Sequence, residues 1–460
     1  MKVRFSSSSI AVFSFLICSF LVALTASPAL ARSIPKKNGL GSKGNENEKK
    51  ADEECEGRWI HIRELPAQFN TELLSSCKSF PIFTDDFCPF LANHGLGPRT
   101  HNRSLSWYRT DSHYLEPFFH RRLNEYPCLT ADHARANAIF VPYYTSLDAL
   151  PYLYSPHLYN DSAQHGLNLH RFLVDDDNPQ IWARRSGHDH FLVIARPAWD
   201  FSQDPASYPP SWGTSFLHLP AFLNLTVLTV ESRPDPWQEH AIPHPTSFHP
   251  ATLDRLESWI DRASRSPPPP PLPFPRGGGR GGGARIRAEC ENRTDVCQIV
   301  DCSDGACSHD PIRYMVPMLR SRFCLQPPGD TPHTRRSTFD AIIAGCIPVF
   351  FEEISARLQY RWHLPPDDYE KFSVFIPKEE VVFGGVHVAD VLEGVSDKDV
   401  RRMRRKVLEL APRVMYRRHG SSAGLRSRKD AFDVAIDGVL RRIKLRSGSG
   451  EPLLFDDDKL

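Results

Sequence analysis

The sequence has almost no excess charge of either sign. Its 56 Lys and Arg residues nearly match its 55 Asp and Glu residues, so the formal net charge is +1 over 460 residues. A protein whose main partner is nucleic acid usually has a strongly basic face, and this balance argues against nucleic acid as a partner. The length leaves room for two domains of ordinary size, each with its own core.

The sequence also lacks a recognisable zinc motif or P-loop. Four of the 11 cysteines are clustered, but their spacing matches no zinc site. These four are Cys290, Cys297, Cys302 and Cys307. The Gly-rich piece within residues 264–287 follows no expected strand, and its glycines do not have P-loop spacing. Disulfides are the better explanation of the cysteines, although the sequence does not indicate which of them pair.

A long apolar run lies near the N-terminus, from Ile10 to about Ala26, and Lys2 and Arg4 precede it. The small-x-small sequence Ala29-Leu30-Ala31 favours a cleaved signal peptide. The run is also about long enough to span a bilayer, which would leave the basic residues in the cytosol. In both cases the body of the protein is expected to enter the secretory pathway. The expected segments are a cytosolic tail (1–9), a signal anchor or signal peptide (10–31) and a flexible stem (32–54).

Two counts agree with a body that faces an oxidising lumen. Setting Cys18 in the apolar run aside leaves ten of the 11 cysteines, an even number suited to disulfides. Four N-x-[ST] sequons follow the apolar run, and the apolar surroundings of Asn224 argue against its modification. The sequons begin at Asn102, Asn160, Asn224 and Asn292.

Apolar runs separated by segments of helix length predict a first Rossmann-like α/β domain over residues 55–263. Its strands are expected at 58–65, 139–143, 191–195 and 225–230. The Pro/Gly/Arg-rich segment 264–287 is interpreted as a linker, because such a composition does not form a core element. A second Rossmann-like α/β domain is expected over 288–445, followed by a polar tail (446–460).

The stretch from Phe323 to Phe351 has the pattern of a strand, a loop, a helix and a second strand. Its apolar start ends at Pro327-Pro328-Gly329-Asp330, and apolar residues then recur at helical spacing. These helical positions are Phe339, Ile342, Ile343 and Cys346. Gly345 stands where a helix C-cap is expected, before a buried strand. Such units build open parallel sheets, which bind ligands at the carboxyl ends of their strands.

The first turn of this helix carries two arginines, Arg335 and Arg336, at the end where cations are normally unfavourable. The arrangement is explained if an anion binds there to backbone N–H groups and guanidinium groups. A diphosphate near the arginines and a ribose hydroxyl on Asp340 would use every polar group in the stretch. The expected ligand-binding residues are Gly329, Asp330, Arg335, Arg336, Ser337 and Asp340. The alternative is a solvated helix start with a surface Arg–Asp pair.

This stretch, with its R-R-S-x-F-D-x-I-x-A-G-C-I-P-V-F-F core, resembles the exostosin-type glycosyltransferases of family 47. More narrowly, it is similar to plant xyloglucan galactosyltransferases of the katamari type. Further matching pieces occur in the same order and extend the resemblance to about residues 55–442. They lie at 62–70, 188–201, 242–250, 362–365, 375–377 and 429–434. Several long motifs in one order are much more specific than any one of them.

The resemblance implies a single-pass type II Golgi membrane enzyme with a lumenal catalytic part. It also implies the GT-B fold, in which a ligand cleft separates two Rossmann-like domains. Such enzymes invert the anomeric centre as they move a sugar from a UDP-sugar to a polysaccharide. In the katamari-type branch the donor is UDP-galactose and the acceptor is a xylose side chain of xyloglucan. The implied partners are therefore the donor, the polysaccharide, the Golgi membrane and other Golgi glycosyltransferases.

Inversion requires a base that takes the proton from the acceptor hydroxyl while UDP leaves. The base is expected from the first domain, where Asp189, Asp200 and His188 bracket one predicted strand. Each candidate has an alternative: Asp200 caps a helix or pairs with Arg196, and His188 is a satisfied loop histidine. GT-B enzymes usually stabilise the leaving group with basic side chains and a helix N-terminus, so no metal is expected.

Two features remain in tension with this interpretation. Residues 175–177 match the metal-binding D-x-D pattern, but three consecutive aspartates before Asn178-Pro179 are more typical of a solvated turn. Alternating prolines in 271–275 stand where the family has an apolar strand, which suggests that this strand is lost or replaced. The loss would put catalytic competence in doubt. The alternatives are therefore transfer of another sugar, such as arabinose or galacturonic acid, and a catalytically weak sugar-binding subunit of a Golgi complex.

Overall fold

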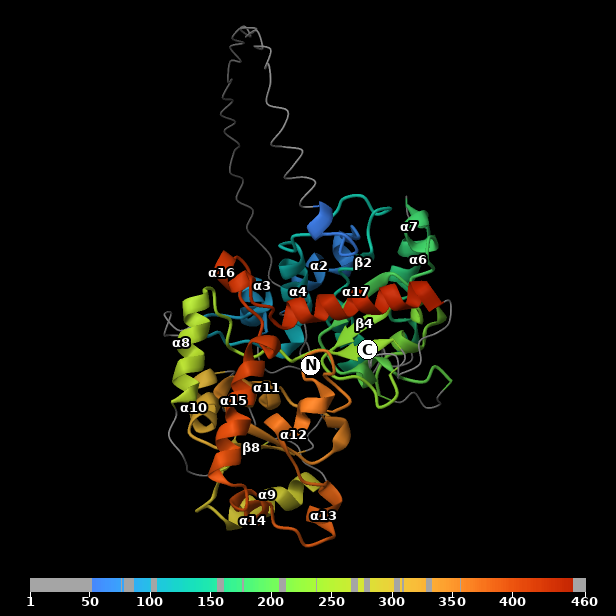
Figure 1. Ribbon diagram of the computed structural model, residues 1–460. Helices are drawn as coiled ribbons and strands as arrows, with labels where there is room; N and C mark the ends of the chain where they lie inside the picture. Colours follow the sequence, from blue (N-terminus) through green and yellow to red (C-terminus); the bar gives the residue numbers. More distant parts are fainter. Residues whose placement is uncertain are drawn as a thin grey trace, which may run out of the picture. The chain divides into compact units, whose positions relative to one another are not determined.

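The computed structural model describes residues 52–449 (Figure 1), apart from 76, 78–86, 101–105, 155–160, 176–177, 207–211, 237, 266–271, 277–281, 302–306, 308–309, 328–332 and 356. Residues from Cys55 onward form one compact unit. Within the described part of the chain, no helix has both the length and the apolar character to cross a membrane. The predicted tail, the apolar run and nearly all of the predicted stem lie outside the described residues.

A five-stranded parallel sheet occupies the first half of the chain, with its strands side by side in sequence order. They are β1 (Ile60–Ile62), β2 (Ala138–Phe140), β3 (His190–Ile194), β4 (Thr226–Thr229) and β5 (Glu239–Ala241). The first four confirm the predicted strands, although β1 is shorter than expected. β5 was not predicted, because its three residues are too few to show a periodic pattern.

Alternate residues of this sheet feed two separate cores, as the pleat of a strand requires. On one face, Phe191 and Val193 of β3 pack with α4 (Leu115–Leu123) and with α17 (Ala431–Ser449). On the other face, Leu192 and Ile194 pack with α5 (Thr145–Tyr154) and α6 (Leu167–Asp175). Both faces of the sheet are therefore covered, which suits an all-parallel sheet.

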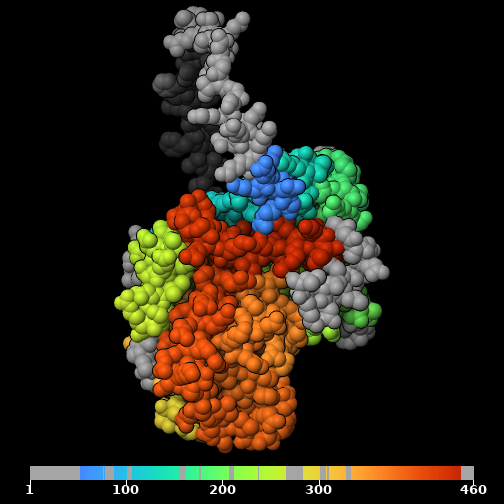
Figure 2. Space-filling view, in the orientation of Figure 1, coloured from blue at the N-terminus to red at the C-terminus, as the bar shows by residue number. Residues whose placement is uncertain are grey.

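The last helix of the described chain, α17, lies against β2 and β4 of the first sheet (Figure 1). Figure 2 shows it on the surface as a red band beside the orange second half of the chain. Most of α17 had been assigned to the second domain (288–445), and that assignment was wrong for this helix. Its apolar residues pack in one core with residues of the first sheet, although α17 follows the second sheet in the sequence.

A second parallel sheet contains the stretch singled out in the sequence. β8 (Phe323–Gln326), β9 (Ile347–Phe350) and β10 (Val374–Phe375) pair in the order β10-β9-β8. Between the first two lies α11 (Arg336–Ala344), which ends at Gly345 with φ +69°. The predicted strand, helix, C-cap and strand are therefore confirmed. The four apolar helical positions all lie in the core.

Part of the segment predicted to be a linker forms regular structure. β6 (Leu272–Arg276) pairs in parallel with β7 (Cys297–Asp301), and α9 (Gly282–Asn292) connects them. The linker prediction for 264–287 was therefore wrong for these residues. A strand does form at the proline-containing position, so the possibility that it is lost was wrong as well.

The alternating prolines are compatible with β6 because a parallel strand bonds to its two neighbours through alternate residues. A ladder to β7 needs the N–H groups of Leu272, Phe274 or Arg276. Pro273 and Pro275 have no N–H, so they occupy the alternate positions, whose backbone nitrogens point away from β7. β8 lies close to β6, and no ladder joins the two among the described residues. The prolines thus divide what would be one sheet, in the order β7-β6-β8-β9-β10.

The remaining helices connect and cover these strands. The α-helices are α2 (Thr71–Ser75), α3 (Ala92–Gly95), α7 (Pro179–Ala183), α8 (Leu253–Ser264), α10 (Pro311–Leu319), α12 (Tyr369–Phe372), α13 (Lys378–Val382), α14 (Val388–Glu393), α15 (Asp397–Val414) and α16 (Ala423–Arg426). The 3-10 turns are η1 (Ala67–Phe69), η3 (Cys88–Leu91), η4 (Ser112–Tyr114), η6 (Ala198–Phe201), η7 (Phe216–His218), η8 (Pro220–Phe222), η10 (Glu353–Ser355) and η11 (Pro366–Asp368).

Four disulfides join pairs of described cysteines, which confirms the prediction that the cysteines pair. They are Cys55–Cys128, Cys77–Cys88, Cys290–Cys297 and Cys324–Cys346. The last of these links β8 to the residue before β9, and so fixes the two strands that flank α11.

Candidate active site

The carboxyl ends of the two sheets meet at the turn that leads into α11. Glu231, just after β4, accepts a hydrogen bond from the hydroxyl of Thr334 in this turn. His244, after β5, places Nε2 3.2 Å from the same hydroxyl. After β3, the strand that pairs with β4, Trp199 of η6 stacks on His333, with 5.5 Å between the ring centroids. Ligands of open α/β sheets bind at the carboxyl ends of their strands, so this junction is the candidate site.

A small, open depression lies at the N-terminus of α11. Arg335 is the N-cap residue of this nine-residue helix, and its Nε donates to the carbonyl of Pro327. Ser337 donates to Gln326 Oε1 at 2.6 Å. The residues that line the depression are Gln326, Pro327, His333, Thr334, Arg335, Thr338, Phe350 and Ser355. The positive end of a helix dipole and a guanidinium group thus face one small polar space, which suits an anion.

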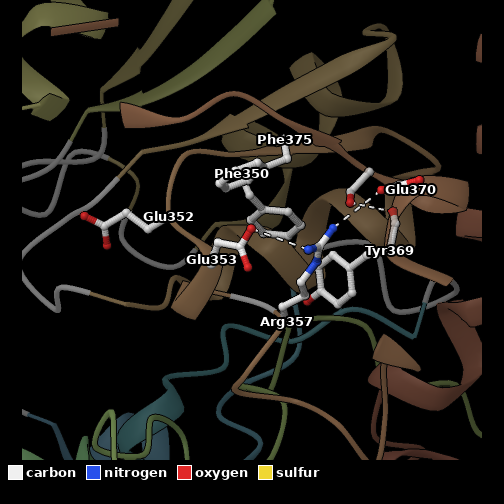
Figure 3. A pocket seen from close by; sticks show the side chains of 8 residues that line it. Phe350, Glu352, Glu353, Arg357, Tyr369, Glu370 and Phe375 are labelled. Carbon is white, nitrogen blue, oxygen red and sulfur yellow. Dashed lines mark hydrogen bonds and ion pairs between the residues drawn. The ribbon is translucent and has the colours of Figure 1, made fainter. Parts of the chain in front are cut away.

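A second small, open depression adjoins the first through Phe350, which lines both. Figure 3 shows Arg357 extending between Glu353 and Glu370, at 3.4 and 3.7 Å. Its guanidinium also lies over the Tyr369 ring, 6.0 Å from the centroid. The space therefore combines aromatic rings with groups that bond to hydroxyls and amides, as in sites for small polar ligands.

Glu352 points away from the other labelled side chains in this view (Figure 3). It pairs with Lys378 and lies 3.8 Å from His333 of the first depression. Burial would raise its pKa, but His333 and Lys378 together lower that pKa. Glu352 therefore holds a negative charge beside Lys378 and close to His333, which lines the first depression.

Arg336 is half-buried, and both of its Nη atoms donate within the protein. It donates to the carbonyl of Thr110, to Ser247 Oγ at 2.7 Å and to the Tyr314 hydroxyl at 2.9 Å. Asp340 lies 3.4 Å from its Nε. Burial raises the pKa of Asp340 to about 6, although Arg336 opposes this shift. Arg336 thus bridges segments from both halves of the chain, and its predicted contact with a diphosphate stays a prediction.

Asp189 and His188 precede β3 and so lie at its amino end, opposite the edge where α11 begins. Asp189 is buried and accepts hydrogen bonds from Arg184 Nε at 2.6 Å and His190 Nδ1 at 2.7 Å. Burial would raise its pKa, but His190 and Arg184 lower it. His188 is exposed, and partial desolvation of its ring, together with the charge of Arg446, lowers its pKa. The structure does not bring these two residues to the other predicted site residues.

Asp200 lies on η6, after the carboxyl end of β3, and so on the same edge as the junction. One of its oxygens accepts from Arg196 Nε at 2.6 Å, and the other accepts from Trp212 Nε1 at 2.8 Å. The pairing with Arg196 was the predicted alternative to a catalytic role, and it is present. Of the remaining predicted residues, Gly329 and Asp330 lie outside the described part of the chain.

Two buried carboxyl groups at this edge were missed in the sequence. Glu231 directly follows a predicted strand, so its place at a carboxyl end was a signal that could have been used. Glu116 of α4 accepts from the backbone N–H groups of Ser146, at 2.8 Å, and Ala195, at 3.1 Å. Burial raises the pKa of Glu116 to about 8. No local pattern marks Glu116, because only the fold brings α4 to the end of β3.

The exostosin GT47 domain matches residues 54–391 of this chain. The chain belongs to the exostosin GT47 family. The probable xyloglucan galactosyltransferase GT19 of Arabidopsis thaliana is 60% identical over 402 residues, which span 85% of this chain and 92% of the relative. The xyloglucan galactosyltransferase MUR3 of the same plant is 37% identical, over 85% of this chain and 63% of the relative. The xyloglucan-specific galacturonosyltransferase 1 of Arabidopsis thaliana is 33% identical, over 86% of this chain and 59% of the relative.

As a GT47 protein the chain is a glycosyltransferase, and its relatives are named for the synthesis of xyloglucan. The GT47 match includes both sheets and the junction between them, but it ends before α15 and α17. The family and the α/β fold with parallel sheets, both expected from the resemblance, are confirmed. The names of the relatives include two different donor sugars.

Proposed function

We propose that this GT47 protein is an inverting galactosyltransferase that moves galactose from UDP-galactose to xylose side chains of xyloglucan. The observation behind the proposal is the junction where the carboxyl ends of both sheets meet at the N-terminus of α11. The 60% identical relative is named as a probable xyloglucan galactosyltransferase, which supports this donor and acceptor. We also propose that the two sheets are the cores of a GT-B arrangement, and that the protein is a single-pass type II protein of the Golgi membrane.

In this proposal the donor occupies the two adjoining depressions. The diphosphate binds at the N-terminus of α11, where Arg335, Thr334 and Thr338 line the space. The nucleoside lies in the second depression, among Phe350, Tyr369 and Arg357. Negative charge that develops on departing UDP is then stabilised by the helix N-terminus and Arg335, without a metal ion.

The base is expected at the carboxyl edge of the first sheet, and Glu231 is the first candidate. Its carboxylate contacts Thr334, the residue immediately before the N-cap of α11. Both oxygens of Asp200, in contrast, accept hydrogen bonds from other side chains. Glu231 is buried, so this role requires the acceptor hydroxyl to take the place of Thr334 at the carboxylate. Glu231→Gln is expected to lower kcat by about 10²–10⁴-fold, the usual contribution of a general base.

The test is a transfer assay with the full chain expressed in a secretory host. The protein is incubated with a panel of UDP-sugars and a xylosylated xyloglucan oligosaccharide, with and without EDTA, and product mass is measured. A hexose gained from UDP-galactose, and undiminished by EDTA, is the expected result.

Transfer of a uronic acid instead would replace the donor assignment, an alternative that the galacturonosyltransferase relative makes specific. A folded protein that binds UDP and transfers no sugar would contradict the proposal.

A further inference from the structure

Trp212 is a large aromatic residue that is held in a fixed position while half of its surface, 51%, remains exposed. Its indole N–H donates to Asp200, and its ring meets Tyr154 edge-on, with 5.5 Å between the centroids. A single exposed aromatic residue is not unusual, but Trp212 has its polar end bonded within the protein, so it presents only an apolar ring surface to a partner.

Trp212 and three neighbouring side chains form a closed ring of contacts, in which each side chain contacts two of the others. Arg196 donates to Asp200 through Nε and to the Tyr154 hydroxyl through Nη2, at 2.9 Å. Its guanidinium also lies 5.6 Å from the centre of the Tyr154 ring. Asp200 and Tyr154 in turn contact Trp212. Each of the four groups is fixed by two others, so the indole is oriented before any ligand arrives.

The backbone next to Trp212 strengthens this position. Gly213 has φ +109°, and a Cβ there would lie 2.8 Å from the carbonyl oxygen of Trp199. Only glycine allows the chain to pass this close to η6. The N–H of Thr214 then donates to the carbonyl of Asp200 at 2.8 Å. The segment that carries Trp212 is thus attached to η6 by its backbone as well as by its side chain.

The ring is also linked to the proposed donor site through η6. Asp200, which holds Trp212, is the neighbour of Trp199, which stacks on His333. His333 lines the depression at the N-terminus of α11. One turn of η6 therefore contacts the exposed indole with one residue and the proposed donor site with the preceding residue.

We propose that Trp212 is an aromatic platform that binds a sugar ring of the polysaccharide acceptor, and that Asp200 is a positioning residue for its indole. The inference rests on the proposed function, because that function supplies a polysaccharide acceptor. Sugar rings present C–H groups with partial positive charge, which match the negative face of an aromatic ring. The platform binds a sugar unit next to the one that receives galactose.

The proposal is tested by two-substrate kinetics with the full chain. Trp212→Ala is expected to raise the KM for the xyloglucan oligosaccharide about tenfold, the usual scale of one aromatic contact. The KM for UDP-galactose is expected to stay within about twofold. Trp212→Phe retains a ring and is expected to recover most of the loss. The matched control is Phe383→Ala, which removes an aromatic side chain that is 85% exposed after α13.

Asp200→Asn separates a positioning role from a catalytic one. The amide offers a single acceptor oxygen to two donors, so the indole loses its anchor and the KM for the acceptor rises. At saturating acceptor, kcat is expected to stay within about threefold of wild type. A loss of kcat by two orders of magnitude, with an unchanged KM for the acceptor, would make Asp200 the base and overturn its positioning role.

Isothermal titration with the xyloglucan oligosaccharide alone keeps the two proposals distinguishable. If wild type shows no transfer but binds the oligosaccharide, and Trp212→Ala does not, the platform stands and the transferase proposal falls. If Trp212→Ala binds as wild type does, or if wild type shows no binding, the platform is overturned.

Discussion

Glu116 is expected to make the stability of this protein fall as the pH rises. Burial raises the pKa of its carboxyl group from an ordinary 4.5 to about 8 in the folded protein. Between these two values the folded chain binds a proton that the unfolded chain does not bind. The favourable contribution of this group is therefore fully present below about pH 4.5 and is lost as the pH rises through about 8.

The size of the effect follows from the same shift. One pKa unit corresponds to 1.36 kcal/mol, so the shift of Glu116 corresponds to about 5 kcal/mol across this window. That is a large part of the 5–15 kcal/mol that typically separates a folded domain from its unfolded state. Glu116→Gln has no titrating group and retains one acceptor for the N–H groups of Ser146 and Ala195. The variant is expected to lose most of the slope.

The assay is urea unfolding of wild type and Glu116→Gln at several values between pH 5 and pH 8.5. The quantity to compare is the difference in free energy of unfolding between the two proteins at each pH. It is expected to shift in favour of the variant by several kcal/mol toward high pH. The control, Glu257→Gln, changes an exposed carboxyl group on α8. A difference that stays constant within about 0.5 kcal/mol over this range would refute the reasoning.

Three further changes test the junction and the core. Arg336→Ala leaves Asp340 buried without its partner and is expected to cost about 3–5 kcal/mol in urea unfolding; normal stability with lost UDP binding would instead indicate direct contact with the donor. Arg335→Ala is expected to weaken UDP binding about tenfold in calorimetry with stability unchanged, and undiminished UDP binding would contradict the anion site. Gly345→Ala is expected to cost about 1 kcal/mol or more, because φ is +69° and the new Cβ would lie 3.1 Å from Leu408; an unchanged urea midpoint would contradict this.

The sequence was sufficient where local pattern and tertiary environment agree. Buried strands such as β3 and β4 appear as short apolar runs, and α11 shows its core face, its C-cap and the strand that follows. The prolines of β6 led to a wrong prediction for a physical reason. They exclude a strand that bonds on both sides, but they permit one that bonds through the residues between them.

The candidate site was less predictable, because its groups meet through long-range packing. Asp200 and Glu231 follow strands, and that position alone places them at the correct edge. The contact of Trp212 with Asp200 requires the chain near residue 212 to lie against η6. No spacing in the sequence reveals this contact. The contacts of Arg336 come from Thr110, Ser247 and Tyr314, which lie between 22 and 226 residues away in the chain.

The position of α17 has a consequence for biosynthesis. This helix covers apolar residues of β2 and β4, yet it leaves the ribosome long after those strands. Phe140 and Leu228 are made some 200 to 300 residues earlier, and their face of the sheet has only part of its cover, which includes α4, until residues 431–449 arrive. The first sheet therefore completes its core only after residues 431–449 have been made. A stop codon shortly before Ala431 would leave a chain with an exposed apolar sheet face, a typical target for chaperones and degradation.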